Sequence, residues 1–363
     1  MSVATIAGAP PGLRSARPTR VMIVDDSLTV RSALSRTLDN EHDLEVVARV
    51  SSAELGLNEL ENTRPDVVLL DLEMPGMGGF KALPKFLEAS PEVKVLVVSS
   101  LTEEGAEATV QALSMGAADT MPKPQTGRFA EDFREQLVAR VRALGRGKAE
   151  RSLASPPAPP RLAPARSTRR PGILAIGAST GGIHALNLLL RSYPASMDAP
   201  ILITQHLPGS FIPVFAKQLE SASGRKAVVV ENDTVVRPGM IHIAPGDGHM
   251  TLRQIAGELR VRIIQGAMPS GCTPSVDPML ESLATAAEGR ALGVLLSGMG
   301  KDGVIGAQAL ADAGGTIFAQ DQESSAVWGM PRAVVEKGLA SVILPPDKLA
   351  PRIAALMEAG AWK

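Results

Sequence analysis

The sequence predicts an α/β fold made of two doubly wound parallel-sheet domains, and three observations support this prediction. Short apolar segments alternate with helix-period segments twice along the chain. A proline-rich stretch separates the two alternations. The apolar segments are rich in valine and leucine on both faces, which is typical of parallel strands covered by helices on two sides. With 363 residues, of which 45% are hydrophobic, the chain is long enough for two cores.

The composition excludes several classes of protein. The formal net charge is -1 with interspersed signs, which argues against a nucleic-acid-binding protein despite the arginines near residues 140–170. No apolar run approaches the ~20 residues that span a bilayer. The single cysteine, Cys272, excludes an intrachain disulfide. We therefore expect a cytoplasmic monomer that binds no nucleic acid and inserts into no membrane, preceded by a disordered Ala-, Pro- and Gly-rich extension at residues 1–19.

The first alternation predicts a domain at residues 20–145. Its expected strands are residues 21–24, 44–50, 67–70, 93–98 and a weaker run near Thr120. Helix-period segments follow these runs, which gives five βα units. We expect a helix over residues 129–144 to close the domain.

A proline-rich segment predicts a linker at residues 146–171. Residues 155–164 read SPPAPPRLAP. Because proline fixes φ and removes a backbone donor, no regular element can continue through this stretch. We expect an extended, semi-rigid tether that leaves the two domains free to move relative to each other.

The second alternation predicts a domain at residues 172–363. Its expected strands are residues 173–176, 200–204, 291–296 and 316–319, with helical segments such as 183–190 between them. Between about residues 228 and 264, short β-branched runs alternate with Gly and Pro turns, as in Gly239-Met240-Ile241-His242-Ile243. This pattern predicts an antiparallel ribbon inserted beside the parallel sheet.

Three acids of the first domain follow expected strands, at the points where these strands end. Asp25 and Asp26 follow the first strand and Asp71 follows the third. Because the carboxyl ends of parallel strands meet at one edge of a sheet, the three carboxylates are expected to converge. Clustered carboxylates need a cation, and Mg²⁺ suits an oxygen-rich site that receives a phosphoryl group. Lys123 and Ser99, after the fifth and fourth strands, would contact phosphate oxygens. The alternative is that each acid is only an exposed loop residue.

Four motifs of the first domain support a resemblance to a known family. They are Asp25-Asp26-Ser27, Asp71 with Met74-Pro75-Gly76-Met77-Gly78-Gly79, Ser99-Ser100 and Lys123-Pro124. Over about residues 20–145 the chain resembles the flavodoxin-like receiver domain of two-component response regulators. The resemblance implies phosphorylation of Asp71 by a histidine kinase, Mg²⁺ bound by Asp25, Asp26, Asp71 and the backbone carbonyl of Glu73, and sensing of the phosphoryl group by Ser99 and Lys123. Thr120 departs from the pattern, because many receivers have a switching aromatic residue there.

A glycine-rich turn follows the first expected strand of the second domain. It reads Gly177-Ala178-Ser179-Thr180-Gly181-Gly182 and leads directly into a helix. In one interpretation it is a nucleophile elbow that exposes the Ser179 hydroxyl beside backbone amides. In the other, the glycines admit a nucleotide phosphate and Ser179 only caps the helix. No G-x-G-x-x-G follows, and the next strand ends in Gln205-His206 rather than in an acid, which favours hydrolysis.

A serine nucleophile needs a base and a group that orients the base. Two of the five histidines are candidates: His206 ends an expected parallel strand, whereas His249 lies in a turn. We prefer His206, because catalytic groups gather at strand ends. Asp302, in Ser297-Gly298-Met299-Gly300-Lys301-Asp302, meets the same criterion. A lone Asp here is more commonly only a helix N-cap, but the glycines of this loop favour a close approach to a substrate. A backbone amide of this loop, such as that of Met299, could complete an oxyanion hole.

Six motifs of the second domain support a second resemblance. They are Ile176-Gly177-Ala178-Ser179-Thr180-Gly181-Gly182, Thr204-Gln205-His206, Ile243-Ala244-Pro245-Gly246-Asp247, Pro274-Ser275-Val276-Asp277, Gly298-Met299-Gly300-Lys301-Asp302-Gly303 and Gly329-Met330-Pro331-Arg332. They are similar to the chemotaxis protein-glutamate methylesterases of the CheB family, which have a Rossmann-like catalytic domain. With the receiver, this resemblance covers nearly the whole chain except residues 1–19 and the linker. Gly271-Cys272-Thr273 departs from the family pattern.

The second resemblance implies a function and a set of site residues. The triad would be Ser179, His206 and Asp302, with backbone donors from Met299 and Thr180 in the oxyanion hole and no cofactor in the catalytic domain. Substrates would be methylated glutamates of methyl-accepting chemotaxis receptors, with deamidation of receptor glutamines in some members. A histidine kinase of the CheA type would supply the phosphoryl group. We expect Cys272 to be a small, partly buried thiol rather than a rival nucleophile. The alternative function is a non-catalytic adaptor that binds a receptor or nucleotide without turnover.

Overall fold

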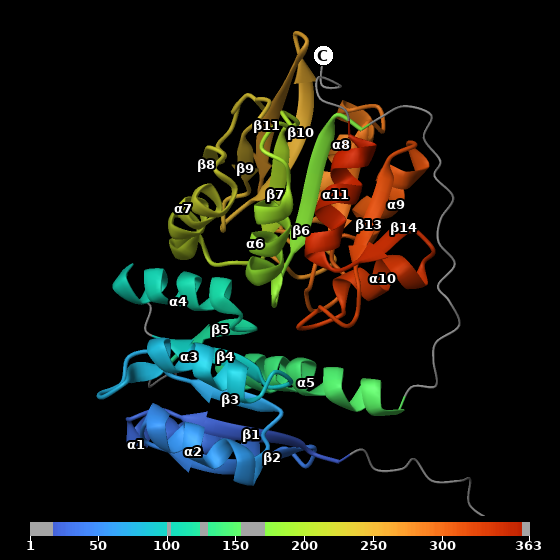
Figure 1. The fold of residues 1–363 in the computed structure, drawn as a ribbon. Helices are drawn as coiled ribbons and strands as arrows, with labels where there is room; N and C mark the ends of the chain where they lie inside the picture. The colour runs from blue at the N-terminus through green and yellow to red at the C-terminus, as the bar shows by residue number, and fades with distance from the viewer. Residues whose placement is uncertain (1–16, 100–102, 124–129, 154–170, 358–363) are drawn as a thin grey trace, which may run out of the picture.

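Two parallel sheets, each covered by helices on both faces, make up the fold (Figure 1). The computed structural model describes residues 17–99, 103–123, 130–153 and 171–357. The predicted fold class is confirmed. Most of the expected extension at residues 1–19 and most of the expected linker lie outside the described residues. No helix in the described ranges is both long enough and apolar enough to cross a membrane.

The first sheet has the strand order β2-β1-β3-β4-β5, and all its neighbours are parallel. Its strands are β1 (Thr19–Val24), β2 (Leu44–Val50), β3 (Val67–Leu70), β4 (Lys94–Ser99) and β5 (Asp119–Pro122). Its helices are α1 (Leu28–Asp39), α2 (Ala53–Thr63), α3 (Gly78–Ala89), α4 (Glu103–Met115) and α5 (Ala130–Leu153). All four residues of β3 are buried, as expected for a central strand with helices on both sides.

Helix α5 is longer than the sequence pattern predicted. It continues to Leu153, through the first eight positions of the expected linker at residues 146–171. Residues 146–153 read RGKAERSL, in which arginine, lysine, alanine and glutamate favour a helix, and the first proline comes only at residue 156. Expecting the helix to end at residue 144 was therefore wrong, because proline and not charge ends this kind of segment.

The second sheet has the order β14-β13-β12-β6-β7-β9-β8. Its strands are β6 (Ile173–Ala178), β7 (Ile201–Gln205), β8 (Ala227–Val229), β9 (Ile241–Ile243), β12 (Ala291–Leu295), β13 (Thr316–Gln320) and β14 (Ala340–Leu344). Its helices are α6 (Gly182–Ser192), η1 (Gly209–Phe211), α7 (Ile212–Ser223), α8 (Asp277–Ala286), α9 (Val304–Asp312), α10 (Met330–Glu336) and α11 (Pro346–Leu356). Helices α6, α7 and α11 pack together on one face, and α8, α9 and α10 on the other.

The antiparallel ribbon is shorter than predicted. It consists of β10 (His249–Ile255) paired with β11 (Glu258–Ile264), and it packs against α8. The earlier part of the expected ribbon belongs to the main sheet instead, since β9 runs parallel between β7 and β8. Ile241, His242 and Ile243 are all buried. A strand buried on both faces belongs to a covered parallel sheet rather than to a half-exposed ribbon.

The two halves of the molecule contact each other through α4 and β5 of the first half. In Figure 1, α4 lies beside α6 and α7, between the two sheets. Buried apolar residues of α4, such as Val110, belong to the same hydrophobic cluster as Ile183 and Leu186 of α6. The first half therefore covers the end of the second sheet at which β6 finishes.

Candidate active site

Ser179 lies in the tight turn between β6 and α6. Its amide donates to Ser297 O at 3.0 Å, and its carbonyl accepts from Gly182 N at 2.7 Å. Gly181, the N-cap of α6, has φ +77, and an added Cβ there would meet Ser297 Oγ at 2.6 Å. Both the left-handed backbone and the close neighbour require glycine. The turn thus holds the Ser179 hydroxyl at the carboxyl edge of the sheet.

His206 follows β7, the neighbour of β6, and reaches Ser179 from there. Its Nδ1 lies 3.1 Å from Ser179 Oγ, and its Nε2 lies 2.7 Å from Asp302 Oδ2. With Nε2–H donating to the carboxylate, Nδ1 is the nitrogen that can accept the hydroxyl proton. The structure brings together the serine, imidazole and carboxylate that the sequence indicated.

Asp302 lies between β12 and α9, and its carboxylate is held by several donors. Oδ1 accepts from Ser275 Oγ at 2.7 Å, and Oδ2 accepts from the Val276 amide at 2.7 Å and from His206. The N-cap of α9 is Gly303, without a side-chain cap. Asp302 is not the helix cap that the sequence left open, and its carboxylate instead points toward His206.

The charges of His206 and Asp302 stabilise each other. Burial lowers the pKa of His206, but the hydrogen bond to Asp302 and the nearby Cys272 outweigh burial and raise it to about 9. Burial raises the pKa of Asp302, but its hydrogen bonds and the charge of His206 bring it down to about 2. Burial, followed by the Asp302 charge, raises the pKa of the neighbouring Asp277 to about 6. Asp302 is therefore the carboxylate that stays ionised.

Two backbone amides beside Ser179 have no acceptor among the described residues. They belong to Thr180 and Met299, the two residues proposed from the sequence as oxyanion donors. Gly298 lies so close to Ser179 that an added Cβ would be 2.8 Å from Ser179 Cβ. The loop that contains Met299 therefore passes directly over the nucleophile, as an oxyanion hole requires.

Two other histidines of the second half, His249 and His242, have structural partners. His249 is buried, its Nδ1 accepts from the Ser275 amide at 2.9 Å, and its Nε2 lies 2.9 Å from Gly266 O. His242 is buried in β9 and accepts from the Arg237 amide. Neither contacts Ser179, so the preference for His206 over His249 agrees with the geometry.

Sequence reasoning missed the environment of Cys272. It found no base beside this thiol, yet Cys272 Sγ, a nitrogen of His206 and an oxygen of Asp302 lie within 4.8 Å of one another. It also gave no role to Ser275, which orients Asp302. Both residues lie in a loop at residues 266–275, where no periodic pattern fixes the direction of a side chain. The motif Pro274-Ser275-Val276-Asp277 was the only feature of the sequence that pointed to a role for this loop.

The acidic cluster of the first half also forms at strand ends. Asp25, Asp26 and Asp71 have carboxylate oxygens within 4.8 Å of one another. Lys123 Nζ lies 2.6 Å from Asp71 Oδ2 and 3.7 Å from Asp25 Oδ2. Burial raises the pKa of Asp25 and of Asp71 despite this ammonium, whereas the pair with Asp71 raises the pKa of Lys123 in spite of burial. The Lys123 ammonium therefore pairs with two buried carboxylates. Its charge does not fully offset the cost of removing both of them from water.

This cluster fits a bound Mg²⁺. Asp25 Oδ2 is buried and has no hydrogen-bond partner among the described residues. An all-oxygen set of carboxylates is the ligand chemistry that Mg²⁺ prefers. The sequence-based assignment of Asp25, Asp26 and Asp71, with the Glu73 carbonyl, as the metal site is therefore consistent with the side chains present.

The two proposed phosphoryl sensors differ in their contacts. Lys123 points at Asp71, whereas the Ser99 hydroxyl lies 2.8 Å from Thr109 Oγ1 of α4, and both hydroxyls are buried. Thr120, in place of an aromatic residue, is buried in β5. The Ser99 hydroxyl thus contacts the helix that packs against the second half.

A polar contact joins β5 to the nucleophile turn. Thr180 Oγ1 donates to Asp119 Oδ2 at 2.6 Å, and Gly181 N donates to Ala118 O at 2.6 Å. Arg140 Nη1 of α5 pairs with the same Asp119 oxygen at 2.9 Å. The first half therefore contacts the two residues that follow Ser179.

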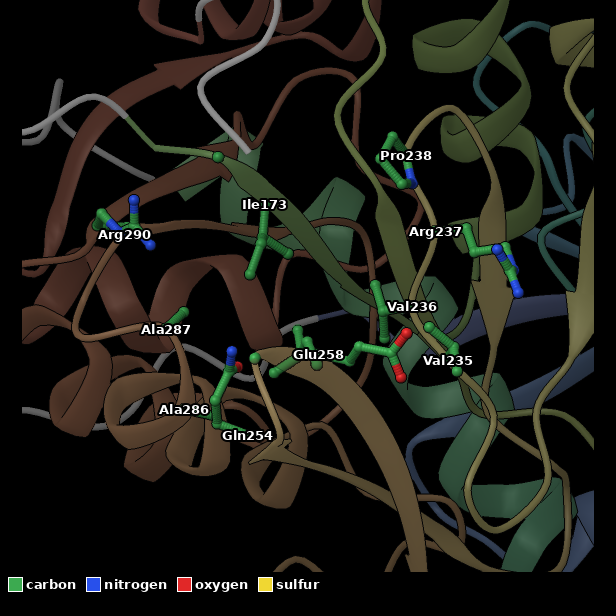
Figure 2. A pocket seen from close by; sticks show the side chains of 13 residues that line it. Ile173, Val235, Val236, Arg237, Pro238, Gln254, Glu258, Ala286, Ala287 and Arg290 are labelled. Carbon is green, nitrogen blue, oxygen red and sulfur yellow. The ribbon is translucent and has the colours of Figure 1, made fainter. Parts of the chain in front are cut away.

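A separate cavity of about 340 Å³ lies at the opposite, amino-terminal end of β6 (Figure 2). It is lined by Ile173 and by apolar side chains such as Val235 and Val236, with Glu258 and Arg290 at its walls. It contains no serine, cysteine or histidine. Ligands of open α/β sheets bind at the carboxyl ends of strands. The edge of the sheet that contains Ser179 is therefore a better candidate for the substrate site than this cavity, despite the size of the cavity.

Comparison with known families matches both halves of the chain. The family model described as CheB methylesterase matches residues 174–353. The model described as response regulator receiver domain matches residues 21–132. A relative from Azospirillum brasilense named protein-glutamate methylesterase/protein-glutamine glutaminase is 39% identical, covering 96% of this chain and 95% of the relative. A relative from Caulobacter vibrioides, with the same name followed by the number 2, is 42% identical over 92% of this chain and 98% of its own.

One solved structure that the second half resembles is the catalytic domain of the Thermotoga maritima CheB methylesterase. It is 34% identical, covers 52% of this chain and 98% of that chain, and has a TM-score of 0.49.

Proposed function

The chain belongs to the CheB methylesterase family and has a receiver domain, and from this premise we propose that it hydrolyses glutamate methyl esters on methyl-accepting chemotaxis receptors. Deamidation of receptor glutamines is the same acyl transfer with ammonia as the leaving group. We assign the receiver to residues 20–145 and the catalytic domain to residues 172–363, in a cytoplasmic monomer. The contact of Ser179, His206 and Asp302 carries the proposal, because these three side chains form a nucleophile, a base and an orienting acid.

The proposed reaction proceeds through an acyl-enzyme. Ser179 Oγ attacks the side-chain ester carbonyl while His206 Nδ1 takes the hydroxyl proton. The amides of Thr180 and Met299 donate to the oxygen that becomes negative. His206 then protonates the departing methanol, and water releases the glutamate by the reverse use of His206. Asp302 holds the Nε2–H and stabilises the imidazolium.

Replacing the nucleophile tests this mechanism. Ser179→Ala should lower methanol release from methylated receptor by a factor on the order of 10⁶. Ser221→Ala, which changes an exposed serine of α7, is the matched control. Unchanged turnover in Ser179→Ala would exclude the assignment. A serine-directed probe separates the esterase from a non-catalytic adaptor, since an adaptor would leave Ser179 unlabelled.

We propose that the receiver controls the catalytic domain by covering it. Asp71 would be phosphorylated by a histidine kinase of the CheA type, with Mg²⁺ held by Asp25, Asp26, Asp71 and the Glu73 carbonyl to neutralise the phosphoryl charge. The added charge would draw Lys123 and the Ser99 hydroxyl toward Asp71. Ser99 would then leave Thr109, which loosens α4 and β5 from the Ser179 turn. The contacts of Thr109 and Asp119 support this route.

A further inference from the structure

Three side chains with different ligand atoms meet at the base of the triad. Cys272 Sγ, a ring nitrogen of His206 and a carboxylate oxygen of Asp302 lie within 4.8 Å of one another. The thiol reaches this point because its loop is folded back toward the sheet: His249 accepts from the Ser275 amide at 2.9 Å, and Ser275 donates to Asp302. Cys272 is half-buried, and the His206 side chain is 14% exposed, so the cluster can be reached from solvent.

We propose that His206, Cys272 and Asp302 form a Zn²⁺ site, and that metal bound there turns the esterase off. Thiolate, imidazole and carboxylate are the three ligand types of protein zinc sites, and three protein ligands leave the fourth tetrahedral position to water. The other such cluster among the residues that the structure describes, Asp25, Asp26 and Asp71, offers oxygen atoms alone. Hard cations such as Mg²⁺ prefer such a set, whereas the sulfur and nitrogen ligands select Zn²⁺.

The distances fit a tetrahedral ion after small movements. Bonds of about 2.3 Å to sulfur and about 2.0 Å to nitrogen and oxygen set the ligand atoms about 3.3–3.7 Å apart. Atoms now up to 4.8 Å apart must approach by about 1 Å. The 2.7 Å contact between His206 Nε2 and Asp302 must open instead. Asp302 is fixed by Ser275 and Val276, so the His206 ring is the part that moves.

Metal binding therefore breaks the hydrogen bond on which the triad depends. When Zn²⁺ binds, the Cys272 thiol becomes a thiolate and its proton passes to the buffer, as does any second proton on the His206 imidazole. His206 then binds the ion through the lone pair of one ring nitrogen, its one remaining proton lies on the other nitrogen, and Asp302 no longer orients the ring. His206 cannot take the Ser179 proton. The loss of esterase activity rests on the proposed function, whereas the binding of the ion does not.

Binding is tested on the full-length protein with Mg²⁺ in excess, so that the receiver cluster does not compete. Zn²⁺ titrated against a chromogenic chelator should bind with a Kd below about 1 µM. Cys272→Ser should weaken binding about 100-fold. Asp26→Asn, which alters only the oxygen cluster, is the matched control. The proposal is overturned if Asp26→Asn removes the tight site or if Cys272→Ser retains it.

A spectroscopic measurement on the unaltered protein tests the site even if the Cys272→Ser variant does not fold. Co²⁺ bound to the unaltered protein should give a near-ultraviolet thiolate-to-cobalt absorption band, because Cys272 is the only cysteine of the chain. Absence of this band at full Co²⁺ occupancy contradicts the site without reference to any variant.

Inhibition is measured with a small chromogenic ester, each protein being compared with its own metal-free rate. One equivalent of Zn²⁺ should lower the rate of the unaltered protein at least tenfold and should have little effect on Cys272→Ser. Tight, Cys272-dependent binding without inhibition overturns the inhibitory role. If Ser179→Ala is as active as the unaltered protein without metal, it is the proposed function that fails, while the binding result still decides the site.

Discussion

Asp71 of the first half and Asp302 of the second both lie beyond the carboxyl end of a parallel strand but have opposite electrostatics. Both are buried acids that follow a central parallel strand, and each contacts a cationic or basic side chain. Burial raises the pKa of Asp71, whereas the pKa of Asp302 is lowered to about 2 because its hydrogen bonds outweigh burial.

The number of donors explains the difference. Asp302 receives hydrogen bonds from Ser275, the Val276 amide and His206, and these keep its pKa low although a second acid, Asp277, lies beside it. Asp71 and Asp25 share one lysine. A carboxylate that is fully hydrogen-bonded can stabilise a charge that forms during a reaction, while a poorly compensated one is ready to bind a cation and accept a phosphoryl group. Two buried acids beyond the ends of parallel strands are therefore suited to the two different roles that we propose for them.

Among the changes that compare the two acids, we expect the largest effect when each is replaced by asparagine. Asp302→Asn should lower kcat by about 10⁴-fold. The neutral amide is a weaker acceptor than the carboxylate for the His206 Nε2–H hydrogen bond, and it no longer stabilises the imidazolium. Asp71→Asn should instead abolish the response to a phosphodonor. Asp312→Asn, an exposed acid at the end of α9, is the control. Rates of methanol release with and without a phosphodonor distinguish the two outcomes, and a similar loss of kcat in both variants would break the comparison.

Opposite shifts in pKa predict opposite effects on stability. The folded pKa of Asp302, about 2, lies below its ordinary value of 3.8, so its contribution is present above that value and is lost as the pH falls toward 2. The folded pKa of Asp71 is raised, so its contribution is present below the ordinary value and is lost as the pH rises through the folded pKa.

At pH 7 without Mg²⁺, Asp302→Asn should therefore lower the free energy of unfolding by on the order of 2 kcal/mol, whereas Asp71→Asn should raise it. Urea unfolding at pH 7 and again near pH 3 measures both differences, which should shrink in acid. Destabilisation by Asp71→Asn at pH 7 would show that Lys123 fully compensates that carboxylate.

A smaller effect is expected where the two halves meet. Asp119→Ala removes the acceptor of the Thr180 hydroxyl, so the unstimulated esterase rate should rise about fivefold, which corresponds to a coupling of about 1 kcal/mol. Stimulation by a phosphodonor should shrink by the same factor. Arg134→Ala, which breaks an exposed ion pair with Glu41 elsewhere on α5, should leave both rates unchanged. A rate that does not change in Asp119→Ala would mean that the contact does not restrain the site.

The parallel sheets and the strand-end residues could be predicted from the sequence because both depend on local patterns. Apolar runs mark strands. Ser179 and His206 each follow such a run directly, and Asp302 follows one after a glycine-rich loop. Two predictions from such local patterns were wrong. Helix α5 continues into charged residues that favour a helix, and β9 is buried on both faces although its flanking turns are typical of a ribbon.

Residues whose role depends on long-range folding were not predictable. Cys272 approaches His206 only because His249 and Ser275 hold a loop that no periodicity describes. Asp119 contacts Thr180 across 61 positions and between two halves of the molecule, so no spacing in the sequence points to it. Side-chain partners of this kind are set by the packing of whole units rather than by neighbouring residues.

The hydroxyl of Thr180 contacts the receiver, while its amide is one of the two oxyanion donors that we propose. Simple steric cover would exclude a bulky receptor helix but would still admit a small ester, whose hydrolysis would then not respond to phosphorylation. If the Asp119 contact also positions an oxyanion donor, as we propose, even a small ester should be hydrolysed with a higher kcat once phosphorylation breaks that contact. Under the proposed mechanism, control would therefore be built into the catalytic turn itself and would act on the transition state as well as on access.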